Sequence, residues 1–150
     1  AKAEGVHTNL DTSGNPFTDQ EPWHSGWLEL MKYTDLVMLD IKQIDEQEHI
    51  KLTGHSNKNI LAMARELSDM KKPVWIRHVL VPDGSDKDEY LHRLADFIHT
   101  LSNVERVEVL PYHTLGKFKW ENLGLSYPLE GVNPPTQERI DNARKILGAI

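Results

Sequence analysis

Four short apolar runs in the chain predict β-strands. The second run, residues 35–40, shows no alternation of polar and apolar residues from Leu36 to Leu39, which is typical of a strand buried on both faces of a parallel sheet. The third run is rich in β-branched and aromatic residues and ends at a Pro-Asp-Gly turn. We therefore expect strands over residues 6–10, 35–40, 74–81 and 104–110.

Between these runs, apolar residues recur at helical spacing. The spacing predicts helices over residues 22–33, 57–70, 86–101 and 136–150, and a short acidic helix between Asp45 and Gly54. Ser56 or Asn57, Ser85 or Asp86, and Thr136 are the candidate N-caps. Residues 114–120 are expected to form a loop, and residues 121–134, which contain Pro and Gly, an irregular crossing segment.

The strands recur at intervals of roughly 30 residues, which is the period of a βα unit. The predicted fold class is therefore α/β, with about four parallel βα units in a single domain over residues 1–150. Four units are too few to close a (β/α)8 barrel, so we expect an open, partial barrel. The absence of an initiator Met and the early start of the first strand suggest a piece of a longer protein.

Composition excludes several classes of function. The net charge of −6 disfavours nucleic acid as a partner, because phosphate contacts require a basic surface. No apolar run approaches the roughly 20 residues that cross a bilayer, and no signal core is present, so we expect no membrane association and a cytoplasmic location. The chain has no cysteine. It can therefore supply no disulfide, no thiolate nucleophile and no cysteine ligand for a cluster.

Polar residues follow the apolar runs and should converge, since parallel strands lie about 5 Å apart and end at one edge of the sheet. This rim comprises Asp11, Thr12, Asp40, Lys42, Arg77 and His113. Two carboxylates at Asp11 and Asp40 would repel unless a cation lay between them, and Thr12 adds an oxygen suited to a hard ion. The alternative is that each residue only caps its own turn.

The basic rim residues Lys42, Arg77 and His113 could hold the carboxylate, phosphate, or sugar and amine groups of a ligand. Arg77 interrupts an otherwise apolar strand, where an unpaired charge is costly. A structural ion pair with Asp40 or Asp11 is the alternative for Arg77. His78 should point toward the helices and serve packing. No ligand-like spacing relates the other histidines of this kind, namely His7, His24, His55, His92 and His99, which we interpret as surface or core polar residues.

Four motifs, in order along the chain, resemble those of the pyruvate formate-lyase activating enzymes. They are LDTSG at residues 10–14, DLVMLDIK at 35–42, VWIR at 74–77 and LPYHTLGKFKW at 110–120. This family belongs to the radical S-adenosylmethionine proteins, which have a partial (β/α)6 barrel. The resemblance implies that a [4Fe-4S] cluster cleaves S-adenosylmethionine and that the resulting 5'-deoxyadenosyl radical abstracts hydrogen from a glycine of the partner lyase.

The resemblance also implies roles for the rim residues. It places Asp11, Thr12, the Met38 carbonyl and Asp40 around a monovalent cation. Asp40, Lys42, Arg77 and His113 would then line the S-adenosylmethionine site, with no catalytic residue in this chain. The expected partners are a glycyl-radical enzyme, namely pyruvate formate-lyase, and an electron donor such as flavodoxin or ferredoxin.

One departure from the family pattern is important. The family's C-x-x-x-C-x-x-C cluster loop and its Gly-Gly-Glu motif belong to the first strands of the barrel, and neither occurs here. The chain resembles the C-terminal part of the barrel, and we expect it to be inactive alone. Two alternatives stay open: an activating enzyme for another glycyl-radical enzyme, or a non-catalytic module that docks a partner protein.

Overall fold

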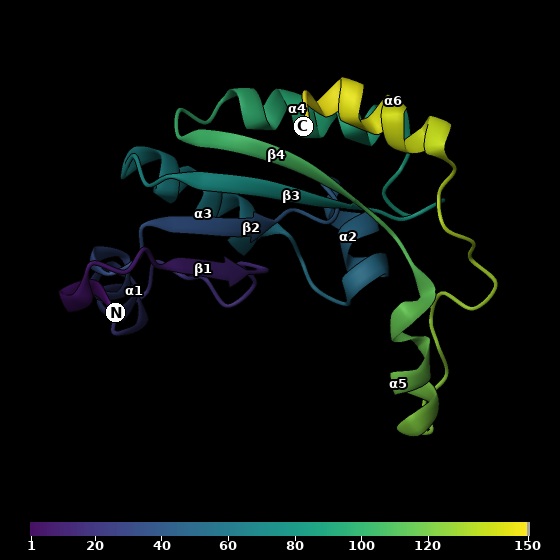
Figure 1. The fold of residues 1–150 in the computed structure, drawn as a ribbon, viewed down its shortest axis with the longest axis horizontal. Helices are drawn as coiled ribbons and strands as arrows, with labels where there is room; N and C mark the ends of the chain where they lie inside the picture. Colours follow the sequence, from purple (N-terminus) through teal and green to yellow (C-terminus); the bar gives the residue numbers. More distant parts are fainter. Residues whose placement is uncertain (150) are drawn as a thin grey trace.

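A computed structural model describes residues 1–149, and its centre is one parallel sheet of four strands (Figure 1). The strands lie side by side in their order along the chain. They are β1 (Asn9–Thr12), β2 (Leu36–Asp40), β3 (Val74–Leu80) and β4 (Val104–Pro111). The predicted α/β class with four parallel strands is confirmed.

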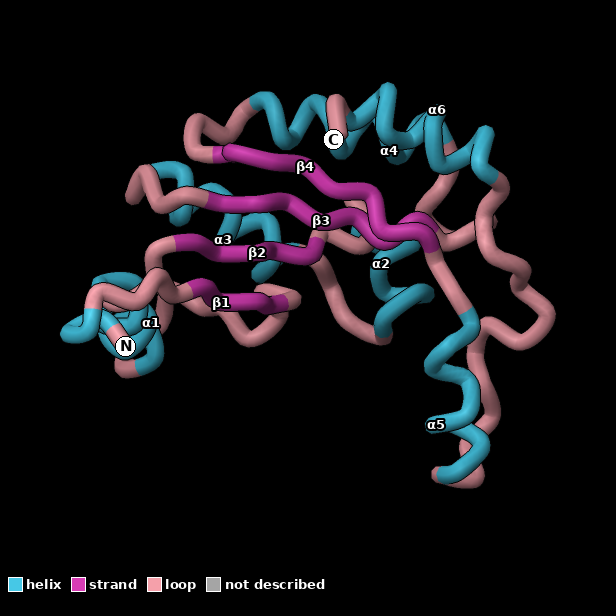
Figure 2. The backbone as a smooth tube through the Cα atoms, in the orientation of Figure 1, coloured by secondary structure: helices cyan, strands magenta, loops and turns pink. Residues whose placement is uncertain are grey.

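Helices occupy most of the segments between and after the strands (Figure 2). They are α1 (Trp23–Lys32), α2 (Glu46–Thr53), α3 (Lys58–Asp69), α4 (Asp88–His99), α5 (Lys117–Asn122) and α6 (Gln137–Leu147). Short 3-10 turns form at Lys2–Glu4 and Thr114–Gly116. The expected loop at 114–120 is wrong, because that segment forms the second 3-10 turn and then enters α5. A helix of six residues is too short to show an apolar period in the sequence.

Some predicted caps are present and others are wrong. Thr136 caps α6 by accepting a hydrogen bond from the amide of Arg139, and Gly54 ends α2 in the left-handed conformation. At α3, which of the two candidates caps is now clear: the side chain of Asn57 makes no capping bond, whereas the hydroxyl of Ser56 accepts the amide of Lys58 at 3.2 Å. α4 begins two residues later than Asp86 and has no side-chain cap.

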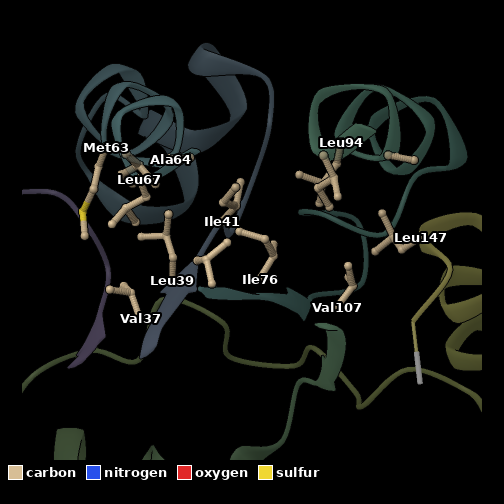
Figure 3. Packing of buried hydrophobic residues seen from close by; sticks show 14 of the residues in the cluster. Val37, Leu39, Ile41, Met63, Ala64, Leu67, Ile76, Leu94, Val107 and Leu147 are labelled. Carbon is tan, nitrogen blue, oxygen red and sulfur yellow. The ribbon is translucent and has the colours of Figure 1, made fainter. Parts of the chain in front are cut away.

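The core fills the space between the sheet and one layer of helices (Figure 3). In β2, Val37 and Leu39 are fully buried on the helix side, whereas Met38 and Asp40 point to the opposite face and are half-buried. The prediction that residues 35–40 are buried on both faces is therefore only partly right: on that opposite face Leu36 is buried, but Met38 and Asp40 are not fully so. Within residues 1–149, helices cover only one face of the sheet, and the other remains open.

The first strand begins later than predicted. β1 starts at Asn9, and Val6 is 52% exposed, so the apolar run at 6–10 is mostly a lead-in to the strand. After β1 the chain turns tightly at Gly14, where φ is +68° and an added Cβ would lie 2.9 Å from Cδ1 of Leu39. Only glycine fits this turn without strain. The turn thus packs directly on β2 and fixes where β1 ends.

Beyond the carboxyl end of β4, an arm formed by residues 114–131 projects away from the strands (Figure 1). It carries exposed apolar side chains, including Leu115 at 75% and Leu123 at 73% exposed. Across residues 1–149, the helices are all too short or too polar to span a bilayer.

Candidate functional site

Arg77 bridges the two carboxylates that the sequence placed at the rim. Its Nε donates to Oδ1 of Asp40 at 2.8 Å, and its Nη2 donates to Oδ1 of Asp11. Asp40 and Arg77 are partners in the β2–β3 register, so their side chains emerge on the same face of the sheet. All three residues lie on the open face; Asp11 and Asp40 are near and at the carboxyl ends of β1 and β2, and Arg77 lies within the longer strand β3, level with Asp40.

The charges in this cluster are partly shielded from water. The side chains of Arg77 and Asp40 are 16% and 17% exposed, and that of Asp11 is 54% exposed. Burial by itself would lower the pKa of Arg77, but the hydrogen bond to Asp11 and the charge of Asp40 outweigh it and leave that pKa raised. The guanidinium therefore stays charged and neutralises its carboxylate neighbours.

The oxygens that the resemblance assigns to a monovalent cation do not form an open coordination site in this arrangement. Arg77 already occupies one oxygen of Asp11 and one of Asp40. The hydroxyl of Thr12 accepts the amide of Gly14 at 3.0 Å. Met38 lies opposite Asp11 in the β1–β2 register. An alkali ion would have to share these carboxylates with the guanidinium or displace it, because both positive charges need the same oxygens.

Lys42 lies just beyond β2 and extends the cluster. Its Nζ is 3.9 Å from Oδ2 of Asp40, the oxygen that Arg77 does not use. Asp40 and Lys42 also line a half-open cavity of about 300 Å³ at the strand ends. A cavity with one acidic and one basic wall can hold a ligand that carries both an ammonium and a carboxylate group, as S-adenosylmethionine does. The residues present therefore fit the amino-acid part of that cofactor.

Sequence reasoning missed the far wall of this cavity. His49 and Thr53 of α2, and His55 just after it, line the cavity together with Ser13, Asn15 and Ile60. His49 is 2% exposed, and its Nδ1 donates to the carbonyl of His55 at 2.6 Å. The histidine within the acidic sequence of α2 could have indicated a functional residue in this segment. Its proximity to Lys42 depends on how α2 packs, which local sequence does not encode.

His113 lies apart from the charged cluster. It is exposed, follows β4, and is neither part of the cavity wall nor hydrogen-bonded to Asp40, Lys42 or Arg77 in the described chain. Next to it, the hydroxyl of Tyr112 is 2.7 Å from that of Tyr127. Burial, aided by this hydrogen bond, raises the pKa of Tyr112 to about 12. The tyrosine pair fixes the base of the arm beside His113, a contact that the sequence did not predict.

This chain does not contain ligands for an iron–sulfur cluster. It has no cysteine, and residues 1–149 contain no group of three or more His, Asp or Glu side chains placed to hold a metal ion. Such clusters are normally held by cysteine thiolates. The residues present therefore do not fit a [4Fe-4S] cluster.

Sequence comparison finds relatives over nearly the whole chain. The chain is 55% identical over 147 residues to the pyruvate formate-lyase-activating enzyme of Streptococcus mutans serotype c (strain ATCC 700610 / UA159), covering 98% of this chain and 56% of that protein. The corresponding enzymes of Staphylococcus epidermidis (strain ATCC 12228 / FDA PCI 1200) and Staphylococcus aureus (strain USA300) are 56% and 53% identical, with 97% of this chain and 58% of each relative covered. No family model matches the sequence.

Structural comparison supports the fold. A domain of the pyruvate-formate lyase-activating enzyme from Bacteroides vulgatus ATCC 8482 superposes with a TM-score of 0.76 at 21% identity, covering 98% of this chain and 78% of that one. A radical SAM methyltransferase from Sphaerobacter thermophilus gives a TM-score of 0.62 at 18% identity, covering 93% and 37%. Over nearly its whole length, this chain is thus similar, at 53–56% identity, to pyruvate formate-lyase-activating enzymes, and it spans 56–58% of the length of the curated relatives that it matches.

Proposed function

We propose that this chain supplies part of the S-adenosylmethionine site of a radical enzyme that activates pyruvate formate-lyase. The observation that carries the proposal is the cluster of Asp40, Arg77 and Lys42, in which Asp40 and Lys42 lie at and just beyond the carboxyl end of β2 and Arg77 lies beside Asp40 in β3. In α/β folds ligands bind outside this edge. The 53–56% identity to pyruvate formate-lyase-activating enzymes supplies the reaction class.

In this proposal each rim residue has a stated role. Lys42 and Arg77 bind the carboxylate of the cofactor, and Asp40 accepts hydrogen bonds from its ammonium or ribose groups. His113, which follows β4, contributes its imidazole to the same cofactor site. When bound, the cofactor and the [4Fe-4S] cluster supply the chemistry that removes a hydrogen atom from a glycine of the lyase. The cluster ligands come from residues outside this chain, since it contains no cysteine.

The same proposal extends to partners and location. The substrate partner is pyruvate formate-lyase, and a flavodoxin or ferredoxin delivers the electron. Both are proteins of the cytoplasm, where we place this chain. A net charge of −6 disfavours nucleic acid as a partner.

The test uses the complete polypeptide that contains this chain, reconstituted without oxygen. Lys42→Ala, Arg77→Gln and His113→Ala should each lower the yield of glycyl radical on pyruvate formate-lyase, measured by electron paramagnetic resonance. Misplacement by about 1 Å can cost roughly 100-fold in rate. The matched controls are His92→Ala and His99→Ala, which change exposed residues of α4.

Cluster content and the thermal midpoint are measured for every variant. Full radical yield in all three rim variants, or a loss that follows the thermal midpoint alone, would overturn the assigned roles. Cofactor cleavage without radical formation on pyruvate formate-lyase would indicate that another glycyl-radical enzyme is the substrate.

A further inference from the structure

Behind Lys42, three buried polar side chains bind the backbone of the two loops that follow β2 and β3. His78, Asn57 and Gln43 are 2%, 2% and 0% exposed. None of the three lines the cavity at the rim. We propose that this carbonyl clamp, made of His78, Asn57 and Gln43, positions Lys42 and Asp40 for the cofactor. The inference rests on the proposed function and adds positioning residues to that site.

His78 holds the backbone between the two rim residues. Its Nδ1 is 2.8 Å from the carbonyl oxygen of Ile41, and its Nε2 is 3.2 Å from that of Ser85. A carbonyl only accepts, and a neutral imidazole has a single N–H. Burial lowers the pKa of His78, which keeps the ring neutral. The shorter distance assigns the proton to Nδ1, so the ring donates to Ile41, the residue between Asp40 and Lys42.

Asn57 holds the other side of the same segment. Its Nδ2 donates to the carbonyl of Gln43 at 3.0 Å and to that of Ile44 at 2.8 Å. The amide of Ile41 donates to the carbonyl of Arg77 at 2.9 Å. The backbone is therefore anchored on both sides of Lys42. Asn57 precedes α3 but does not cap it, which leaves its amide free for this contact.

Gln43 joins this loop to the next one. Its Nε2 donates to the carbonyl of Gly84 at 2.8 Å, and its Oε1 accepts the amide of Asp45 at 3.0 Å. The loop after β3 is itself held by Ser85, whose hydroxyl donates to the carbonyl of Val79 at 2.6 Å. The loops that follow β2, which ends at Asp40, and β3, which contains Arg77, are thereby connected below the rim.

The position of the clamp explains its polarity. A carbonyl buried without a donor is costly, so these side chains are required once the loops are buried. The same contacts also fix the backbone that carries the rim residues. Here the contacts fall on Ile41, Gln43 and Ile44, on both sides of Lys42. Such supporting contacts give a ligand-binding side chain its precise placement.

Four variants of the complete, cluster-loaded protein test the clamp. His78→Phe keeps a ring but removes the donor, and Asn57→Ala removes the second donor. His78→Asn retains an amide N–H close to the position of Nδ1. Asn103→Ala is the matched control, because Nδ2 of Asn103 donates to the carbonyl of Lys72 at 2.6 Å, before the start of β3 and away from the rim. Lys42→Ala serves as the reference for a lost cofactor contact.

Three readouts are taken: the dissociation constant for S-adenosylmethionine, the thermal midpoint, and amide hydrogen exchange over residues 41–45. We expect His78→Phe and Asn57→Ala to weaken cofactor binding about tenfold, by analogy with the loss of groups that orient metal ligands. Exchange at 41–45 should accelerate in both. His78→Asn should retain most of the affinity even where its midpoint falls, and Asn103→Ala should lower the midpoint without changing affinity.

The outcomes separate this inference from the function on which it rests. If Lys42→Ala leaves cofactor affinity unchanged, the proposed site is wrong. If Lys42→Ala weakens binding but His78→Phe and Asn57→Ala do not, the site stands and the clamp is overturned. Equal affinity losses in Asn103→Ala and the clamp variants would also overturn it, because they would show a general effect of stability.

Discussion

Arg77 and Asp40 face each other across the β2–β3 register, with Nε of the guanidinium 2.8 Å from the carboxylate. A second carboxylate, that of Asp11, binds the same guanidinium. One positive charge thus neutralises two neighbouring acids at the open face of the sheet. The arrangement predicts how this site should respond to substitution and to salt.

Arg77→Gln should lower the free energy of unfolding by about 1–3 kcal/mol, because two charge-assisted hydrogen bonds are lost and the carboxylates repel. It should also make the thermal midpoint depend on the cation, with sodium or potassium chloride more stabilising than choline chloride. Arg93→Gln is the control, since Arg93 forms an exposed pair with Asp45. If the thermal midpoint of Arg77→Gln is identical in all three salts, the carboxylates of Asp11 and Asp40 do not bind a cation in place of the guanidinium.

Asp11→Asn tests the other half of the same hypothesis. The substitution keeps the shape of the side chain but removes one of the two negative charges that attract a cation. We expect the complete protein to lose both its dependence on alkali cations and part of its cofactor cleavage, measured as 5'-deoxyadenosine formed. Unchanged cleavage with every alkali cation would remove Asp11 from the cation site.

The 150-residue chain alone should bind no iron–sulfur cluster and cleave no S-adenosylmethionine, because thiolate ligands are absent. Anaerobic reconstitution, followed by visible absorbance and analysis for 5'-deoxyadenosine, measures both. Stoichiometric cluster absorbance on this chain would contradict the interpretation.

The edge of the sheet at β1 should promote self-association of the 150-residue chain. β1 pairs only with β2 in the described sheet, so its outer backbone groups have no strand partner there. Unpaired strand edges favour pairing with another chain. Sedimentation at increasing concentration should show dimers or larger species. A monomer throughout the concentration range would refute this.

His78 should make stability depend on pH. Its pKa is lowered by burial, whereas in the unfolded chain it should be close to the ordinary value of about 6.5. Below that value the unfolded chain takes up a proton that the folded chain resists. Stability should therefore be constant above about pH 6.5 and fall as the pH drops below it. Urea midpoints of the chain and of His78→Phe measure the effect, and equal pH slopes would contradict it.

Much of the sheet and its rim follow from the sequence. Val37 and Leu39 mark a buried strand because apolar residues must leave water, and this places Asp40 and Lys42 at its carboxyl end. Arg77 is conspicuous because a charge inside an apolar strand needs a partner. These features depend on the local order of residues, which the sequence states directly.

Other features required the tertiary structure. Arg77 could pair with Asp11, with Asp40 or with a ligand, and only the strand register shows that it binds both acids. The short helix α5 has no apolar period to reveal it. Likewise, His78 and Asn57 were expected to pack and to cap, yet both bind the loop around Lys42. Hydrophobic periodicity determines which face of an element is buried, whereas the partners of a polar side chain depend on contacts between residues distant in sequence, which only packing decides.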